Sequence, residues 1–336
     1  MRPRRSGRGS MRTGERLAHR SALFKIVYFL AVVLGWALLA AAIGAIWLHW
    51  FPGRGRVSTA AASAVPLLIL AGVPALLILA LTRRWITVVV TVIALGVGIW
   101  TQAPLLRGVA DPGGDRITVV QANIKLGAGD VETVVARVRA SRADLLTIEE
   151  MTPAALDRLR QTDLRSLLPH EFAVPGTGGV GTGIFSRYPL RDTAQLTDFG
   201  LNNLRADVDL PGAPGTTVFA VHPIPPYPYD PARWVREMKL LRDTLHETTA
   251  ENVIVSGDFN ATWDHAQFRA LLRNGFRDAT EQVGGRWQFT YPSDDWYGPL
   301  IGIDHVLARG LTAVSLNTFD VPASDHRALE VSLTAR

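Results

Sequence analysis

The sequence predicts a chain of two parts, in which three transmembrane helices precede an α/β domain. Three observations support this prediction. Three long apolar stretches fill the first third of the chain, and strand-like and helix-like segments alternate from residue 115 onward. The charge also changes sign. Residues 1–114 carry 13 Lys and Arg and two acidic residues, a balance of +11, whereas residues 115–336 carry 22 basic and 28 acidic residues, a balance of −6.

This division of charge limits the classes of function. The high isoelectric point belongs to the N-terminal part, so it does not favour nucleic-acid binding. The downstream region lacks the basic balance that is typical of a dedicated duplex binder. The chain contains no cysteine, which excludes disulfides, thiolate metal sites and cysteine nucleophiles.

The apolar stretches cover residues 24–50, 58–81 and 85–106. A bilayer crossing needs about 20 residues, so each stretch is long enough to span. A cleaved signal peptide followed by other helices is the alternative, but the apolar core of a signal peptide is much shorter. Tryptophans lie mostly toward the ends of these stretches, where an aromatic belt is expected: Trp36, Trp47, Trp50, Trp85 and Trp100. We therefore expect a basic leader over 1–22 and a membrane domain with three transmembrane helices over 23–107.

Arginine placement predicts the orientation. The leader contains seven arginines, which favour a cytoplasmic N-terminus: Arg2, Arg4, Arg5, Arg8, Arg12, Arg16 and Arg20. The two short loops are each basic and give no further preference. After three crossings, residue 107 onward would lie on the outer face of the cell membrane, so we expect an extracytoplasmic domain over 115–336.

Downstream segments alternate between strand and helix patterns. Strands are expected at 116–122, 143–148, 183–186, 204–210, 216–221, 252–256, 303–308 and 329–333. A helix is expected at 130–140, with Asp130 as its N-cap, and others begin at Pro153 and Pro231. Gly176, Gly178 and Gly181 match the spacing of a dinucleotide-binding loop. Because they precede a strand instead of opening a helix, we interpret them as an ordinary loop.

The strongest local signal is the segment 253–261, in which an apolar strand ends in a glycine and then presents Asp258 and Asn260. Side chains two residues apart on an extended backbone point the same way. A carboxylate and an amide that converge in this manner can orient a water molecule or hold a hard metal ion. An ordinary Asx turn is the alternative interpretation.

Other polar residues stand at the ends of further expected strands. Asn123 and Glu150 follow the first two, Asp304 lies inside an apolar strand, and the pair Asp325 and His326 precedes the last one. An isolated acid of this kind is usually solvated or a helix cap, and a lone histidine is more often structural. Together, however, polar groups at several strand ends are typical of sites in α/β folds.

In this order, the set resembles the endonuclease/exonuclease/phosphatase superfamily over residues 116–333. The pieces that carry the resemblance are Asn123, Glu150, His222-Pro223, the run 257–260, the run 303–306 and the run 324–326. The resemblance implies a four-layer sandwich of two mixed β-sheets flanked by helices.

The resemblance also implies a metal site. Glu150 would be the principal Mg²⁺ ligand, with Asn123 beside it and Asp325 near the ion, and Mn²⁺ is an alternative ion. Mg²⁺ prefers oxygen ligands and retains waters, so one or two carboxylates suffice. The family usually has Gln where this chain has Glu149. The choice between Glu149 and Glu150 therefore stays open, although the spacing from Asp144 favours Glu150.

The implied catalytic residues are His222, Asp258, Asn260, Asp304 and His326. Asp258 and Asn260 would hold and activate the attacking water. His326 would contact the scissile phosphate and be oriented by Asp304. His222 would either stabilise the phosphate or protonate the leaving group. Many relatives also carry Arg where this chain has Gly302, and the insertions with which apurinic-site enzymes grip DNA are not evident.

The predicted function is Mg²⁺-dependent hydrolysis of a phosphodiester or phosphomonoester at the membrane bilayer. The substrate could be a lipid headgroup, a small molecule or a nucleic acid, and no protein partner is indicated. The alternatives are a membrane-tethered nuclease and a catalytically silent scaffold of the same fold. Tyr227 and Tyr229 in the proline-rich loop after His222, and the aromatic residues of 287–297, would either serve structural connections or form a rim that faces the substrate.

Overall fold

The computed structural model describes residues 8–53, 55–284 and 287–335, and in the first helix it describes side chains from residue 22 onward. The contacts divide the chain into two compact units. One unit comprises Met1–Trp47 and Val65–Thr101, and the other comprises Leu48–Ala64 and Gln102–Arg336. The first seven residues of the predicted basic leader lie outside the described residues, and the rest of the leader is helical.

The first unit is helical and apolar. It contains most of α1 (Arg8–Trp50), α3 (Val65–Leu70), α4 (Gly72–Leu81) and nearly all of α5 (Trp85–Gln102). Two helical segments, Ala22–Trp50 and Trp85–Gln102, are each long and apolar enough to cross a membrane. The prediction of helices that are long and apolar enough to span is confirmed for these two, and their insertion in a membrane stays a prediction.

The second apolar stretch differs from the prediction of three uninterrupted spans. It is broken into α2 (Arg56–Ser63), α3 and α4, with a bend of 72° between Arg56–Ser63 and Val65–Leu81. Pro66 explains the break, because its ring clashes with the carbonyl of Ala62 in a continuous helix. The pair is therefore either one broken span or a re-entrant loop.

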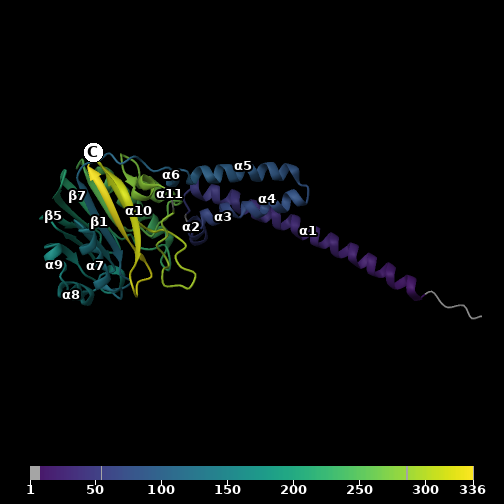
Figure 1. Cartoon of the computed structure of the whole chain (residues 1–336), viewed down its shortest axis with the longest axis horizontal. Coiled ribbons are helices and arrows are strands. Elements are labelled where there is room, and N and C mark those ends of the chain that lie inside the picture. The colour runs from purple at the N-terminus through teal and green to yellow at the C-terminus, as the bar shows by residue number, and fades with distance from the viewer. Residues whose placement is uncertain (1–7, 54, 285–286, 336) are drawn as a thin grey trace, which may run out of the picture. The chain divides into compact units, whose positions relative to one another are not determined.

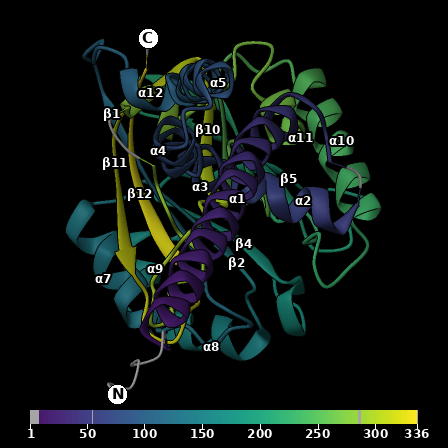
Figure 2. The same ribbon diagram turned by 90° about the vertical axis from the view of Figure 1, so that its right-hand side faces the viewer.

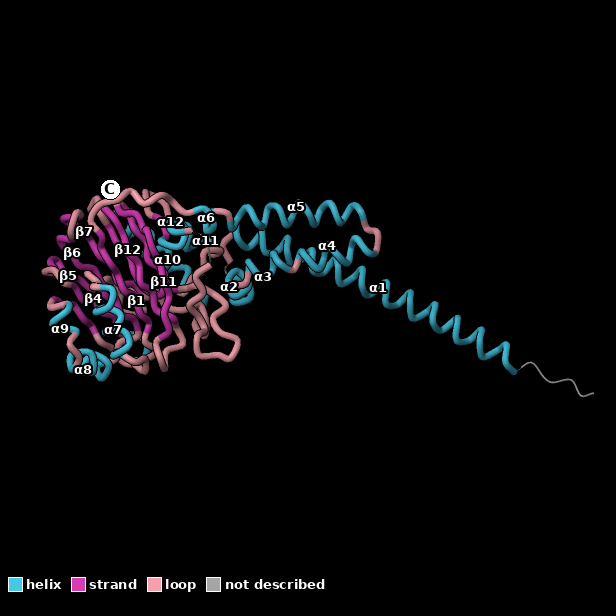
Figure 3. The backbone as a smooth tube through the Cα atoms, in the orientation of Figure 1, coloured by secondary structure: helices cyan, strands magenta, loops and turns pink. Residues whose placement is uncertain are grey.

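The second unit is built around two mixed β-sheets of six strands each (Figures 1 and 3). The first sheet has the order β11 (Leu311–Asp320), β12 (Arg327–Ala335), β1 (Arg116–Asn123), β2 (Leu145–Glu149), β4 (Thr182–Ser186), β3 (His170–Val174). The second has the order β5 (Leu190–Gln195), β6 (Leu204–Leu210), β7 (Ala213–Val221), β8 (Val253–Asp258), β10 (Asp304–Arg309), β9 (Arg277–Asp278). In each sheet one central pair, β1 with β2 and β7 with β8, is parallel.

Helices cover the outer faces of the two sheets. Figure 2 shows α7 (Val131–Ser141) on one flank, and α10 (Pro231–Glu247) and α11 (Ala266–Leu271) on the opposite flank. Apolar side chains from both sheets, including Val119, Leu145, Ile254 and Val306, are fully buried between them. The expected four-layer sandwich is therefore confirmed. The smaller elements are α6 (Pro104–Arg107), α8 (Pro153–Gln161), α9 (Leu164–Leu167), the 3₁₀ turn η1 (Gly178–Val180) and α12 (Ala279–Val283).

The predicted helix starts are also found. Asp130 accepts a hydrogen bond from the Thr133 amide at the start of α7, and Thr152 accepts one from the Ala155 amide at the start of α8. Each bond satisfies a backbone donor that has no partner inside the helix. Pro153 occupies the first turn of α8, where its missing N–H costs nothing.

The segment Leu48–Ala64, which the sequence places in the membrane region, belongs to the same compact unit as the two sheets. The imidazole of His265 lies 3.1 Å from the Thr59 carbonyl through Nε2 and accepts from the Thr262 amide at 2.9 Å through Nδ1. Burial lowers the pKa of His265 to about 4, so the ring is neutral and Nε2–H donates to Thr59. Gln267 donates to the Gly53 carbonyl at 3.1 Å. These bonds fix α2 to the sheet domain.

Candidate active site

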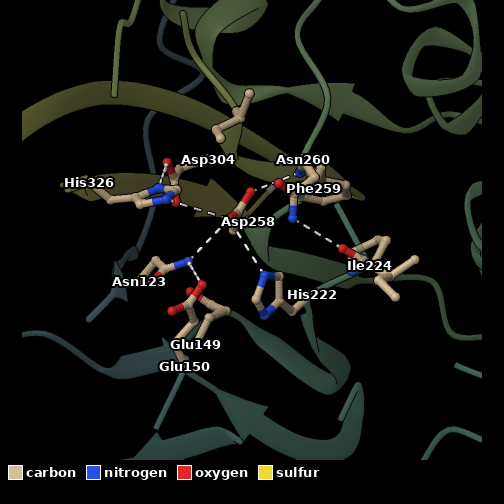
Figure 4. Close-up of polar contacts among 12 residues, drawn as sticks. Asn123, Glu149, Glu150, His222, Ile224, Asp258, Phe259, Asn260, Asp304 and His326 are labelled. Carbon is tan, nitrogen blue, oxygen red and sulfur yellow. Dashed lines mark hydrogen bonds and ion pairs between the residues drawn. The ribbon is translucent and has the colours of Figure 1, made fainter. Parts of the chain in front are cut away.

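Six strand ends, each with a polar side chain, meet at one edge of the two sheets (Figure 4). The parallel pairs β1/β2 and β7/β8 end there, while β10 and β12, which run antiparallel to their neighbours, begin there. The register places Asp304 directly opposite Asp258. The residues that this arrangement brings together are Asn123, Glu150, His222, Asp258, Asp304 and His326.

His326 is held between two carboxylates. Its Nδ1 lies 2.8 Å from Asp304 Oδ2, and its Nε2 lies 3.8 Å from Asp258 Oδ2. Burial alone would lower the pKa of His326, but the charges of Asp304 and Asp258 outweigh burial and raise that pKa to about 10. The same charge holds the pKa of Asp304 below its usual value despite burial. At neutral pH the site therefore contains an imidazolium whose orientation is fixed by Asp304.

Asp258 lies at the centre of the hydrogen-bond network. Its Oδ1 accepts from the Asn260 amide at 2.8 Å, and its Oδ2 accepts from Asn123 Nδ2 at 3.1 Å. Burial raises the pKa of Asp258 to about 7, and the charge of His326 only partly opposes that effect. A carboxylate with a pKa near neutrality can accept a proton from water and release it again.

His222 has the opposite character to His326. Its Nε2 lies 3.6 Å from Asp258 Oδ2, and its buried Nδ1 has no hydrogen-bond partner among the described residues. Burial lowers its pKa to about 4, so its ring is neutral at pH 7. The contact between His222 and Asp258 is therefore not an ion pair, because the imidazole is neutral. Two histidines in one site are held in different protonation states by their surroundings.

Gly257 near the end of β8 and the left-handed backbone of Asn260 position Asp258 and Asn260. A Cβ atom on Gly257 would approach the Val221 carbonyl oxygen to 2.0 Å, so only glycine fits where β8 passes β7. Asn260 adopts a left-handed φ of 50°, which Asn tolerates, and donates from Nδ2 to the Pro223 carbonyl at 3.1 Å. That bond joins the strand end after β8 to the loop that follows His222.

Glu150 and Asn123 lie side by side, with Asn123 Nδ2 3.3 Å from Glu150 Oε1. Glu150 has a left-handed φ of 58°, and its Oε2 accepts from the Leu126 amide at 2.6 Å. The turn directs the Glu150 side chain toward the site, whereas Glu149, the last residue of β2, is fully buried. Asp325 is half-buried, 3.9 Å from Lys125 Nζ, and burial raises its pKa.

All eight predicted site residues thus belong to one region. Six of them line a common cavity, namely Glu150, His222, Asp258, Asn260, Asp325 and His326. Asn123 and Asp304 lie behind that surface and are hydrogen-bonded to its members. The geometry is compatible with the predicted roles, which stay predictions.

Sequence reasoning missed Gln121, and it suggested Tyr291 only as one of the aromatic residues of 287–297. Gln121 is fully buried in β1 and donates to both Glu149 Oε2 at 2.8 Å and Asp304 Oδ1 at 2.9 Å. An amide inside an apolar strand was the available signal. The ring of Tyr291 lies 4.9 Å from the ring of His326, centroid to centroid. No local pattern distinguishes Tyr291 from the other aromatic residues of its loop.

The sequence of this domain also matches a known protein family. Residues 120–326 match the model of the Endonuclease/Exonuclease/phosphatase family. The chain belongs to this family. A search of curated protein sequences gives no match.

Solved structures of the family share the fold. Humanized D. rerio TDP2 aligns with a TM-score of 0.56 and 16% identity over 65% of this chain and 98% of that chain. D. rerio TDP2 in complex with a single-strand DNA product aligns with a TM-score of 0.54 and 16% identity over 65% and 99%. An AP endonuclease from Archaeoglobus fulgidus aligns with a TM-score of 0.52 and 15% identity over 64% and 98%. At these identities the likeness establishes the fold alone.

Two departures from the family pattern have physical explanations. Glu149 stands where the family usually has Gln. Burial raises the pKa of Glu149 well above its usual value, which favours the protonated carboxyl, a group of nearly the same shape as a Gln amide. Gly302 stands where many relatives have Arg. A Cβ at this position would lie 2.0 Å from the Gln288 carbonyl oxygen, so the backbone here leaves no room for any side chain.

The residues fit a hard divalent cation. The carboxylates of Glu150, Asp258 and Asp325 line the cavity and offer oxygen ligands, which Mg²⁺ prefers. Asn123 faces Glu150 with Nδ2, while its Oδ1 accepts from the Lys125 amide at 3.0 Å. Ligand atoms of Asp258, Asp304 and His326 also lie within 4.8 Å of one another, but Asp304 and His326 are hydrogen-bonded to each other. Glu150 therefore stays the predicted principal ligand.

Proposed function

We propose that the chain is a membrane-anchored, Mg²⁺-dependent phosphoesterase that hydrolyses a phosphodiester or phosphomonoester by attack of an activated water. The observation that supports this most strongly is the pairing of Asp258, which has a pKa near 7, with the cationic His326. Asp258 can accept a proton, and His326 carries a positive charge. The two side chains lie 3.8 Å apart at the ends of the strands. Phosphoester hydrolysis needs both.

The side chains would divide the work as follows. Asp258, steadied by the Asn260 amide, accepts a proton as the water oxygen bonds to phosphorus. The ester P–O bond breaks, and the protonated His326 supplies positive charge to the phosphate and a proton to the leaving oxygen. His222 is neutral at pH 7, so it acts as a hydrogen-bond donor to the phosphate and not as the acid. Glu150, with Asn123, would hold Mg²⁺, which neutralises charge on the phosphate when bound.

A membrane-tethered nuclease is the second candidate. The D. rerio TDP2 structure contains a single-strand DNA product, and another relative in fold is an AP endonuclease. Against this candidate, the region 115–336 has a charge balance of −6. A surface that follows a nucleic-acid backbone needs clustered Lys and Arg. A small or lipid phosphoester therefore fits better.

The full-length chain is the right material for the assay, because truncation near residue 110 would remove α2 from the catalytic unit. In detergent micelles with Mg²⁺ we expect turnover of p-nitrophenyl phosphate, bis-p-nitrophenyl phosphate or both. EDTA should abolish this activity, and added Mg²⁺ or Mn²⁺ should restore it. If neither ester is hydrolysed with either ion, the catalytically silent scaffold becomes the better account.

The composition of the catalytic unit also bears on topology, and we infer three crossings. Leu48–Ala64 and Gln102–Arg336 form one compact unit, so both must lie on the same side of the membrane. In this topology the chain between them crosses twice, through Val65–Leu81 and through α5. At 1.5 Å per residue, Val65–Leu81 extends for about 26 Å, close to the thickness of the hydrocarbon core.

With a cytoplasmic arginine-rich leader, three crossings place the catalytic unit outside the cytoplasm. A reporter that is active only outside the cytoplasm, fused after Arg336, is expected to be active. Activity of only a cytoplasmic reporter at that position would reverse the assignment.

A further inference from the structure

The catalytic side chains open into a cavity of about 840 Å³. This volume lies in the range of sites that enclose an entire small ligand and is far larger than a phosphate group requires. The lining includes Val57, Thr59 and Ala60 of α2, and Tyr227 and Tyr229 of the loop after His222. All of these residues belong to the catalytic unit. The scissile phosphate would occupy one end of the cavity, so the rest of it must be filled by the group that the phosphate esterifies.

Away from the catalytic residues the wall is largely apolar. Val180, Leu201, Pro225, Pro226, Ile301 and Ile303 line it together with Val57 and Ala60. Among the described residues of the lining, Arg56 is the only Lys or Arg. One guanidinium suits a single phosphate, whereas a chain of phosphates would meet mostly apolar surface and carboxylates. The substrate group next to the phosphate is therefore apolar.

Exposed apolar side chains gather around this cavity. Within the described part of residues 110–336, the exposed large apolar side chains are Leu126, Tyr227, Tyr229, Trp287, Trp296, Tyr297 and Leu300. Three of them, Leu126, Tyr227 and Tyr229, line the cavity. The other four stand on one segment, which is fixed beside the site by the hydrogen bond from the Ser293 amide to the Asp325 carbonyl at 2.7 Å. We call these seven residues the apolar rim.

The chemistry of the apolar rim is that of a membrane interface. Trp296 is 94% exposed and Tyr227 is 76% exposed, an unusual state for large aromatic side chains of a soluble surface. Trp and Tyr are the residues enriched where a protein meets the headgroup region of a bilayer. Five of the seven rim residues are Trp or Tyr: Tyr227, Tyr229, Trp287, Trp296 and Tyr297.

The wall of the cavity is also continuous with a membrane helix. Helix α1, which contains the candidate span Ala22–Trp50, ends at Trp50, and α2 begins at Arg56. The segment between them is fixed to the catalytic unit, since His49 Nδ1 lies 2.7 Å from Asp264 Oδ1 and Gln267 donates to Gly53. The chain that leaves the bilayer therefore forms one side of the substrate cavity.

From these observations we infer that the substrate is a phosphorylated lipid of the membrane that holds α1. Its phosphate lies at His326 and Asp258, the adjoining apolar part lies along α2, and the apolar rim rests at the bilayer interface. This inference rests on the proposed phosphoesterase function and specifies its substrate class. A lipid that diffuses in the bilayer reaches such a site without crossing bulk water.

The test compares acylated and deacylated esters with the full-length chain in phosphatidylcholine vesicles. Phosphatidic acid serves as the monoester and phosphatidylglycerol as the diester, each against its water-soluble deacylated headgroup. For at least one pair we expect kcat/KM to favour the lipid on the order of 100-fold, the effect of burying about four methylene groups. Equal values for both pairs would overturn the inference and leave the phosphoesterase proposal intact.

Variants of the cavity wall provide a second readout. Ala60→Phe adds a ring to the wall, and Ala60→Ser is its matched control without added bulk. Ala60→Phe should lower kcat/KM for the preferred lipid by about tenfold or more. A tenfold loss corresponds to about two buried CH₂ groups. Turnover of bis-p-nitrophenyl phosphate should fall less, so the ratio of lipid turnover to p-nitrophenyl turnover should drop. Ala60→Ser should leave this ratio unchanged.

A further variant covers the case in which Ala60→Phe damages the whole site and lowers both activities alike. Tyr227→Ser only removes bulk from the apolar rim, so it should lower lipid turnover in vesicles more than it lowers turnover of bis-p-nitrophenyl phosphate. No selective loss in either variant would contradict the inference. Faster hydrolysis of a single-stranded oligonucleotide than of any lipid would replace it with the nuclease. Failure to hydrolyse either p-nitrophenyl ester would instead reject the proposed function itself.

Discussion

Asp258→Asn should lower kcat on the order of 10³-fold while the protein stays folded, because removal of a general base typically costs 10²–10⁴-fold. The amide has the shape of the carboxylate and can still accept from the Asn260 amide, which now lies 2.8 Å from Oδ1. It cannot accept a proton from water near neutral pH. The measurement is kcat for bis-p-nitrophenyl phosphate at saturating Mg²⁺, with circular dichroism to verify the fold.

The chain offers a matched control in a second buried Asp–His pair. Asp278 Oδ2 lies 3.0 Å from His305 Nδ1, both residues are buried, and neither lines the substrate cavity. Asp278→Asn should lower the melting temperature, since the charge of Asp278 helps to raise the pKa of His305 against burial. It should leave kcat within about twofold of the wild type. A kcat for Asp258→Asn that also stays within about tenfold would remove Asp258 from the role of base.

Glu150→Gln should produce the second large effect, a loss of kcat/KM on the order of 10²–10³-fold at low Mg²⁺, since a bound metal supplies several kcal/mol of charge stabilisation. Glu150 is the carboxylate that the left-handed turn after β2 directs toward Asn123. The loss should shrink as the Mg²⁺ concentration rises, because the variant binds the ion more weakly. Half-saturation by Mg²⁺ in the activity assay measures this directly.

Glu149→Gln is the neighbouring control, and it should retain activity within a few-fold. Burial raises the pKa of Glu149 well above its usual value and so favours the protonated carboxyl, which an amide resembles in shape and charge. The folded-state pKa lies above that of the unfolded chain. The contribution of Glu149 to the free energy of unfolding is therefore fully present below the pKa of the unfolded chain, about 4.5. This contribution is lost as the pH rises from there toward the pKa of the folded protein.

Glu149→Gln removes this titration. Thermal melts in EDTA should show that the variant is more stable than the wild type at pH 7 and equal to it in acid. If Glu149→Gln, and not Glu150→Gln, abolishes Mg²⁺-dependent turnover, the assignment of the two acids is reversed.

The elements that position the chemistry could be predicted from the sequence because their signals are local. Val253–Asp258 is an apolar strand followed by a required glycine turn, and Asp130 and Thr152 cap the helices that follow them. Edge strands carry weaker signals. In β5 (Leu190–Gln195) all but the first residue are exposed, so no alternation of apolar and polar residues marks it.

The cavity wall could not be predicted in this way. Thr59 and His265 stand 206 positions apart, and nothing in α2 separates it from the apolar run that follows. The protonation states of the two histidines are likewise a property of the folded site. His222 and His326 differ because Asp304 lies 2.8 Å from the latter, while burial dominates at the former.

The central claim is that this site hydrolyses phosphoesters by attack of water at phosphorus. The most direct test is to run the Mg²⁺-dependent reaction on bis-p-nitrophenyl phosphate in H₂¹⁸O and to locate the label by mass spectrometry. We predict one ¹⁸O atom in the phosphate product of each turnover and none in p-nitrophenol. Label in p-nitrophenol, or product formed without label in the phosphate, would contradict the account.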